Sequence, residues 1–150
     1  MRNFEFVKRI LTNEDGIKRI LPARSTRNSA GYDFFNLKRV VCKSHQITMI
    51  PTGIKAEFPE DEMLLLFNRS SNPKKKGLII LNGVGVVDSD YYNNPDNEGE
   101  MGFVFYNMLN EDVILEAGEK LGQGIFVKFL TTDNDVATET RIGGFGSTGK

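Results

Sequence analysis

Apolar residues recur at every second position along most of this chain, and this spacing limits the fold more than any other feature. A period of two places alternate side chains on one face of a strand, whereas a helix needs a period near 3.6. The alternating sets are Phe4 and Phe6; Ile54, Ala56 and Phe58; Met101, Phe103 and Phe105; and Leu121, Gln123, Ile125, Val127 and Phe129. The spacing therefore predicts a largely β-stranded protein.

Two short continuous apolar runs, 63–67 and 78–81, are typical of buried strands because they are too short for buried helices. Turn residues separate the strand-like segments, as at Pro51-Thr52-Gly53 and Ala117-Gly118-Glu119. Many short strands at this spacing indicate a sandwich, a barrel or a jelly roll.

One short helix is also expected. Ser71 or Asn72 can cap it, Pro73 suits its first turn, and Gly77 can end it.

Length, charge and cysteine content set broad limits. The chain fits one domain, 1–150, in which the stretch 131–150 is expected to be a flexible C-terminal arm and tail. The net charge of −1 argues against non-specific nucleic-acid binding. One cysteine, Cys42, excludes an internal disulfide, and His45, the only histidine, excludes His-based triads and His-rich zinc sites. We expect a cytoplasmic protein without signal peptide or membrane span.

The glycine-rich end, 141–150, combines a cation, an aromatic ring and hydroxyl groups. Ordering glycine costs much backbone entropy, so such an end does not fold on its own. Arg141, Phe145, Ser147 and Thr148 nevertheless supply the groups needed to clamp an anion and stack on a flat ring. A disordered end is the alternative interpretation, but this composition favours a tail that orders over a nucleotide.

Segment 82–91 is typical of a glycine-containing strand that ends in acids and a tyrosine. Glycine inside a strand often marks the close approach of a ligand, so the backbone near Asn82 and Gly85 could read the edge of a base. Asp88, at the end of the strand, could deprotonate water. Alternatively, these polar residues serve only a turn.

Arg69, Ser70 and Ser71 stand between an apolar strand and the expected helix. A helix N-terminus favours anions, the arginine offers a bidentate fork and the serines offer hydroxyl donors. This pattern predicts a phosphate site, with an ordinary helix cap as the alternative. Asp33 and Gln123 are weaker candidates when each is taken alone.

Five segments occur in a fixed order along the chain. They are AGYD at 30–33, RSS at 69–71, NGVGVVDSDY at 82–91, GEKLGQ at 118–123 and RIGGFGSTG at 141–149. Together they resemble the trimeric all-β deoxyuridine triphosphatase (dUTPase) family, from about Ala30 to Lys150. The resemblance implies a distorted jelly roll, hydrolysis of dUTP to dUMP and pyrophosphate with Mg²⁺ on the triphosphate, and a homotrimer whose sites are shared between subunits.

The resemblance also implies roles in base and sugar recognition. Asp88 matches the general base that activates water for attack on the α-phosphorus. Tyr91 matches the ring that packs under deoxyribose and leaves no room for a 2′-hydroxyl. The implied uracil-binding positions are Asn82, Gly85 and the backbone at Met101 and Gly102.

Other matched positions are expected to hold the phosphates and close the site. The implied phosphate ligands are Arg69, Ser70, Ser71 and Gln123. Asp33 would lie near the metal through water, or would brace the site. In the tail, Phe145 would stack on uracil, and the remaining substrate-binding positions would be Arg141, Gly146, Ser147 and Thr148.

Some positions depart from the family pattern. Asn68 stands where proline commonly precedes Arg-Ser-Ser, and Lys120 replaces a common arginine. Only Ile142 separates Arg141 from the next glycine, where the family often has two residues, and this spacing bears on the reach of that arginine. Residues 92–98 lengthen the connection after Tyr91, either as a tolerated surface insertion or as a site for a protein partner.

Two alternative functions remain open at this point. One is a related deaminase acting on dCTP. The other is a nucleotide-gated protein-interaction role, in addition to catalysis, with the partner bound at the 92–98 loop.

Overall fold

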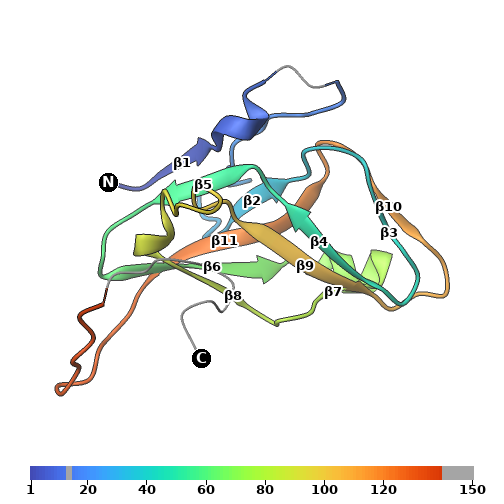
Figure 1. The fold of residues 1–150 in the computed structure, drawn as a ribbon. Coiled ribbons are helices and arrows are strands. Elements are labelled where there is room, and N and C mark those ends of the chain that lie inside the picture. The colour runs from blue at the N-terminus through green and yellow to red at the C-terminus, as the bar shows by residue number, and fades with distance from the viewer. Residues whose placement is uncertain (13–14, 140–150) are drawn as a thin grey trace.

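The structure, a computed structural model, describes residues 1–12 and 15–139. Its backbone consists mostly of strands and loops (Figure 1). The strands are β1 (Asn3–Phe6), β2 (Tyr32–Phe35), β3 (Val40–Cys42), β4 (Ile47–Pro51), β5 (Ile54–Glu57), β6 (Glu62–Asn68), β7 (Leu78–Ile80), β8 (Gly85–Asp88), β9 (Gly102–Asn107), β10 (Val113–Leu115) and β11 (Lys120–Lys128). The all-β prediction is confirmed.

Two sheets carry most of the pairing, and all of their strands are antiparallel. The larger sheet has the order β2-β11-β6-β8, and the smaller has the order β4-β9-β7. β1 pairs with β5 along the top of the view in Figure 1, and β3 pairs with β10 at its right side. Neighbouring strands in these sheets are often far apart in the sequence, as in a jelly roll.

The core lies where the inner faces of these strands meet. Phe34, Phe103 and Phe105 are at most 2% exposed, and Phe34 meets Phe103 edge to face with ring centroids 5.6 Å apart. Leu64 and Leu66 of β6 fill the same layer. Each such side chain contributes roughly 1.5–3 kcal/mol through burial, so this layer fixes the sheets that carry the polar residues discussed below.

β11 departs from the expected alternation. The register of β11 against β2 shifts between Lys120 and Gly122, which marks a β-bulge. After the bulge, Phe126 rather than its neighbours packs against the core. The strand ends at Lys128, so Phe129 is 41% exposed and does not continue the predicted set.

The expected short helix is present as η2 (Asn72–Lys76), and Gly77 ends it with a φ of 60°. The predicted cap is wrong in one respect, because Ser71 makes no side-chain cap hydrogen bond. The Asn72 amide instead donates to the carbonyl oxygen of Leu121 at 2.7 Å, which ties η2 to β11. Among the described residues there are also two single turns, η1 (Lys8–Ile10) and η3 (Ser89–Tyr91).

Beyond β11 the chain leaves the sheets. Residues 129–139 are exposed and belong to no helix or strand, and Figure 1 shows them extending away from the sheets at the lower left. Five expected tail residues lie outside the described residues: Arg141, Phe145, Gly146, Ser147 and Thr148. In the part of the chain that is described, every helix is too short to cross a membrane.

Candidate active site

The segment expected to carry the general base, Asp88, runs along the edge of the larger sheet. β8 pairs with β6, so that Gly85 lies opposite Leu66 and Asp88 opposite Met63. A Cβ at Gly85 would come within 3.2 Å of the Leu66 Cβ, which explains a residue without a side chain here. Asn82 is exposed in the turn before β8. β8 and β9 thus belong to different sheets rather than to one paired hairpin.

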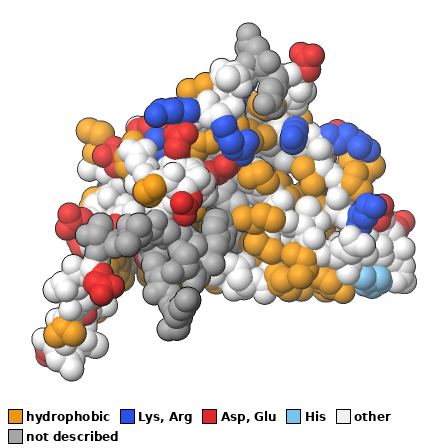
Figure 2. Space-filling view, viewed as in Figure 1, with side chains coloured by type: hydrophobic (Ala, Val, Ile, Leu, Met, Phe, Trp, Pro, Cys, Tyr) orange, Lys and Arg blue, Asp and Glu red, His pale blue; other side chains and the backbone are white. Residues whose placement is uncertain are grey.

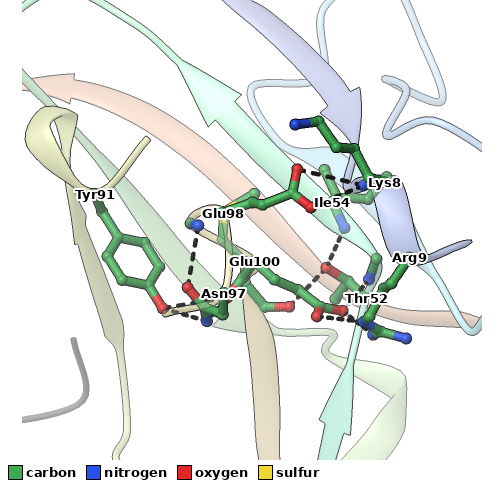
Figure 3. Close-up of polar contacts among 11 residues, drawn as sticks. Lys8, Arg9, Thr52, Ile54, Tyr91, Asn97, Glu98 and Glu100 are labelled. Carbon is green, nitrogen blue, oxygen red and sulfur yellow. Dashed lines mark hydrogen bonds and ion pairs between the residues drawn. The ribbon is translucent and has the colours of Figure 1, made fainter. Parts of the chain in front are cut away.

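Tyr91 stands three residues after Asp88, at the end of η3. The residue is 8% exposed, so its ring is held firmly and offers only a small surface to a ligand. The Asn97 amide donates to the Tyr91 hydroxyl at 2.8 Å (Figure 3). Because η3 begins where β8 ends, Asp88 and Tyr91 are separated by only two residues within this single turn.

The start of β9 is fixed by hydrogen bonds inside the protein. The Met101 N–H donates to the carbonyl of Ile54, and the Met101 carbonyl accepts from the N–H and the hydroxyl of Thr52. Met101 is also 2% exposed. At Gly102, a Cβ would lie 2.7 Å from the Met49 methyl and 3.1 Å from the Ile50 carbonyl oxygen. Met101 therefore supports this strand, and Gly102 allows close packing.

A second group of polar side chains gathers at the other end of the larger sheet; we name Ser25, Asp33, Arg69, Lys120 and Gln123 the Asp33 cluster. Both Lys120 Nζ and the Ser25 hydroxyl donate to Asp33 Oδ2 at 2.6 Å. Arg69 Nε lies 4.0 Å from Asp33 Oδ1. Burial alone would raise the pKa of Asp33, but the hydrogen bonds from Lys120 and Ser25 and the nearby positive charges hold it below its ordinary value.

The predicted phosphate ligands either belong to this cluster, as Arg69 and Gln123 do, or follow Arg69 in the sequence. Gln123 lies opposite Asp33 on the paired strands β11 and β2, and its amide donates to the Asn68 carbonyl at 3.3 Å. Its carbonyl oxygen lies 2.3 Å from where a Cβ on Gly31 would stand, so a side chain there would displace the Gln123 amide. Ser70 is exposed and Ser71 is half-buried, both between β6 and η2.

One strand relates these two groups in space. On β6, Met63 lies opposite Asp88 and Phe67 lies opposite Gln123. Directly opposed residues point to the same face, so Asp88 and Gln123 share the face of the sheet away from the core. The four residue steps from Met63 to Phe67 span about 13 Å. A single chain therefore does not bring Asp88 into contact with the Asp33 cluster.

Apolar side chains cover the sheet between the two polar groups. They stand on the outer face of β6, β8 and β11 and are half-buried or exposed: Met63, Leu65, Phe67, Val86, Ile125 and Val127. Val86 is 60% exposed. The smaller sheet has a similar outer face, where Figure 2 shows hydrophobic side chains gathered over β4, β9 and β7. Exposed residues there include Ile47, Met49 and Leu81.

Sequence reasoning missed several residues that shape the site. The sequence marks Lys120 only as a departure from the family pattern, yet it is a direct partner of Asp33. Arg9 forms a bidentate ion pair with Glu100, whose side chain is only 10% exposed. Such pairs join distant parts of the chain, and no local spacing signals them.

The described residues contain no group of three or more His, Cys, Asp or Glu side chains able to hold a metal ion. Asp33 already contacts an amine and a hydroxyl, so it does not suit a directly bound cation. A divalent ion that arrives on phosphate oxygens, keeping its own waters, is compatible with this donor set.

Comparisons with known proteins all lead to the same enzyme family. Residues 18–149 match the family model described as dUTPase. A protein of Lactococcus lactis named deoxyuridine 5'-triphosphate nucleotidohydrolase is 48% identical over 99% of this chain and 98% of its own. The crystal structure of dUTPase from Streptococcus mutans is 44% identical, covers 87% of this chain and 98% of its own, and superimposes with a TM-score of 0.79.

A more distant structure shares the fold. The dUTPase of phage phi11 of S. aureus, described with a structural Mg(II) ion, is 21% identical, covers 93% of this chain and 97% of its own, and has a TM-score of 0.71. The similarity thus covers nearly the full length of the chain. It concerns the fold in the phage protein, and both the fold and the sequence in the Streptococcus mutans protein. This chain belongs to the dUTPase family of enzymes.

Proposed function

We propose that this protein hydrolyses dUTP to dUMP and pyrophosphate. The observation that carries the proposal is the 48% identity, over 99% of the chain, to a protein named deoxyuridine 5'-triphosphate nucleotidohydrolase. The positions of Asp88, Tyr91 and the Asp33 cluster give this reaction a physical basis.

Asp88 is the proposed general base. A half-buried carboxylate at the end of a strand can accept a proton from water while the water oxygen attacks the α-phosphorus. The bond from the α-phosphorus to the bridging oxygen breaks, and pyrophosphate leaves with that oxygen. The proton from water stays on Asp88 until solvent removes it.

The base and sugar would bind beside Asp88. Tyr91, held by its surroundings, would pack against deoxyribose and obstruct a 2′-hydroxyl. Asn82, Gly85 and Gly102 would contribute backbone groups to uracil. Met101, whose N–H is bonded within the protein, would support this wall rather than donate to the base.

The phosphates would bind at the Asp33 cluster. Arg69 offers a guanidinium, and Gln123, Ser70 and Ser71 offer neutral donors around it. Asp33 would orient Arg69 and would contact Mg²⁺ only through water. Mg²⁺ would be carried mainly by the triphosphate, where it would neutralise charge on the departing pyrophosphate.

Because the two groups are about 13 Å apart along β6 in one chain, we propose that each site combines groups from more than one subunit of a homotrimer. The apolar outer faces of both sheets support this proposal, since exposed apolar patches commonly mark association surfaces. The tail residues proposed to close the site, on the same or a neighbouring subunit, are Arg141, Phe145, Gly146, Ser147 and Thr148.

The test is a product assay on the purified protein with dUTP, dCTP, dTTP and UTP, each with and without Mg²⁺. Mg²⁺-dependent formation of dUMP and pyrophosphate from dUTP alone is expected. Ammonia release from dCTP would support the deaminase alternative instead. Failure to hydrolyse any of the four nucleotides would contradict the proposed reaction.

A further inference from the structure

The loop after Tyr91, residues 92–98, turns several of its polar side chains inward. Asn94 is 4% exposed, and Asn93 accepts a hydrogen bond of 2.6 Å from Lys55. Lys55 is itself buried, and its amine lies 4.9 Å from the centre of the Tyr92 ring. The loop is therefore packed against β5 rather than projecting as a free surface feature.

The far end of the loop is held as well. Both Glu98 carboxylate oxygens accept from the Lys8 N–H, at 3.2 and 3.4 Å (Figure 3). The Glu100 carboxylate receives the Arg9 guanidinium and, at 2.7 Å, the Gly53 N–H. The backbone on both sides of residue 99 is thus tied to the N-terminal segment and to the turn before β5.

Asn97 lies between this fixed backbone and the Tyr91 ring. Its Oδ1 accepts from the Gly99 N–H at 3.0 Å, which orients the amide. Its Nδ2 donates to the Tyr91 hydroxyl at 2.8 Å and to the Glu100 carbonyl at 3.3 Å. The Tyr91 hydroxyl also approaches the Glu100 carbonyl at 3.4 Å. Figure 3 shows the Tyr91 hydroxyl directed at Asn97.

We propose that Asn97 is a positioning residue that fixes the Tyr91 ring and so sharpens selection of deoxyribose over ribose. The proposal rests on the proposed function, in which Tyr91 obstructs a 2′-hydroxyl. Obstruction by a ring requires the ring to stay in place, because a ring that can tilt makes room for one extra oxygen. The 92–98 loop thereby acquires a role in substrate choice through Asn97.

The test compares kcat/KM for dUTP with kcat/KM for UTP in four proteins: the unaltered protein, Asn97→Ala, Tyr91→Phe and the double variant. Asn97→Ala should lower the dUTP-to-UTP ratio roughly three- to tenfold, the range expected for one hydrogen bond. Tyr91→Phe should lower it similarly. The double variant should be no worse than Tyr91→Phe, because both changes remove one interaction.

Asn110→Ala is the matched control. Asn110 is exposed, and its side chain forms a hydrogen bond with His45 rather than with Tyr91. Its ratio should equal that of the unaltered protein. If Asn97→Ala is folded and hydrolyses dUTP with an unchanged ratio, or loses activity on both nucleotides equally, the positioning role is wrong while the proposed function stands. If the unaltered protein neither binds nor hydrolyses dUTP, both proposals fail.

Discussion

Lys120 Nζ lies 2.6 Å from Asp33 Oδ2, and this pair joins β11 to β2 at the end of the larger sheet where the phosphates are proposed to bind. The carboxylate is thereby turned toward protein cations rather than toward solvent. The ionised Asp33 carboxylate therefore helps to hold Arg69, whose Nε lies 4.0 Å from Asp33 Oδ1.

Lys120→Met should therefore weaken the fold in a pH-dependent way. The pKa of Asp33 is lowered in the folded protein, so its stabilisation is present above the unfolded pKa of about 4 and is lost as pH falls through the folded value. Because Lys120 is about one-third exposed, solvent screens the pair, and we expect a loss of about 0.5–1 kcal/mol at neutral pH. Urea unfolding at several pH values measures it. A loss that stays constant down to the lowest pH would contradict the assignment.

Arg9→Met should destabilise the protein by about 1–3 kcal/mol, because it leaves the nearly buried Glu100 carboxylate without its cation. Thermal or urea unfolding at neutral pH provides the measurement. Arg39→Met is the matched control: Arg39 pairs with Glu116, and both side chains are more than half exposed, so the cost should be about 0–1 kcal/mol. Equal losses in the two variants would show that burial of Glu100 does not matter.

Gly122→Ala should cost about 1–3 kcal/mol through overpacking in the core. The added Cβ would stand 2.3 Å from a Phe103 ring carbon and 2.8 Å from the Phe67 carbonyl oxygen, and neither can easily move. Gly16→Ala, where a Cβ meets nothing within 4 Å, is subject only to the strain of a positive φ and should cost less. The two free energies of unfolding can be compared directly; a smaller loss at Gly122 would refute the packing argument.

Asp88→Asn should keep dUTP binding and reduce turnover by roughly 10²–10⁴-fold, the usual range for loss of a general base. Asp96→Asn, an exposed acid in the following loop, should turn over normally. Steady-state kinetics and equilibrium binding on both variants separate the two effects. Near-normal turnover by Asp88→Asn would rule out its role as the base.

Removal of residues 141–150 should sharply reduce dUTP hydrolysis, because the proposed phosphate and ring contacts of the tail are lost. The apolar faces of the sheets are untouched by this deletion, so the oligomeric state should not change. Turnover and sedimentation of the shortened protein test both statements. Full activity after the deletion would exclude the tail from the site.

The sequence predicted the strands well where one face is buried and the ladder is regular. Phe103 and Phe105 on β9 alternate as expected, since both point into the core. Along β11 the predicted period of two is confirmed for Gln123, Ile125 and Val127, which share the outer face. The bulge after Lys120 separates the buried Leu121 from this set and leaves Phe126 packed against the core. A bulge is decided by pairing with other strands, and a single strand's pattern does not contain that information.

The candidate site was predictable to the extent that its residues sit in short motifs. Asp33 and Gln123, each weak alone, do lie opposite one another on paired strands. Ser25 and Asn97 were not found, because each acts through one hydrogen bond to a residue placed beside it only by folding. The assignment of roles to all of these residues remains a prediction.

The register of β6 has a consequence for how this protein can change over evolution. A slip of β8 by two residues along β6 would keep every side chain on its face but carry Asp88 about 7 Å toward or away from Gln123. A slip by one residue would turn the carboxylate toward the core. The register along β6 thus fixes the spacing between the two polar groups of one chain. Extra residues can accumulate in the 92–98 loop without altering that distance, whereas one inserted between Met63 and Phe67 would change it.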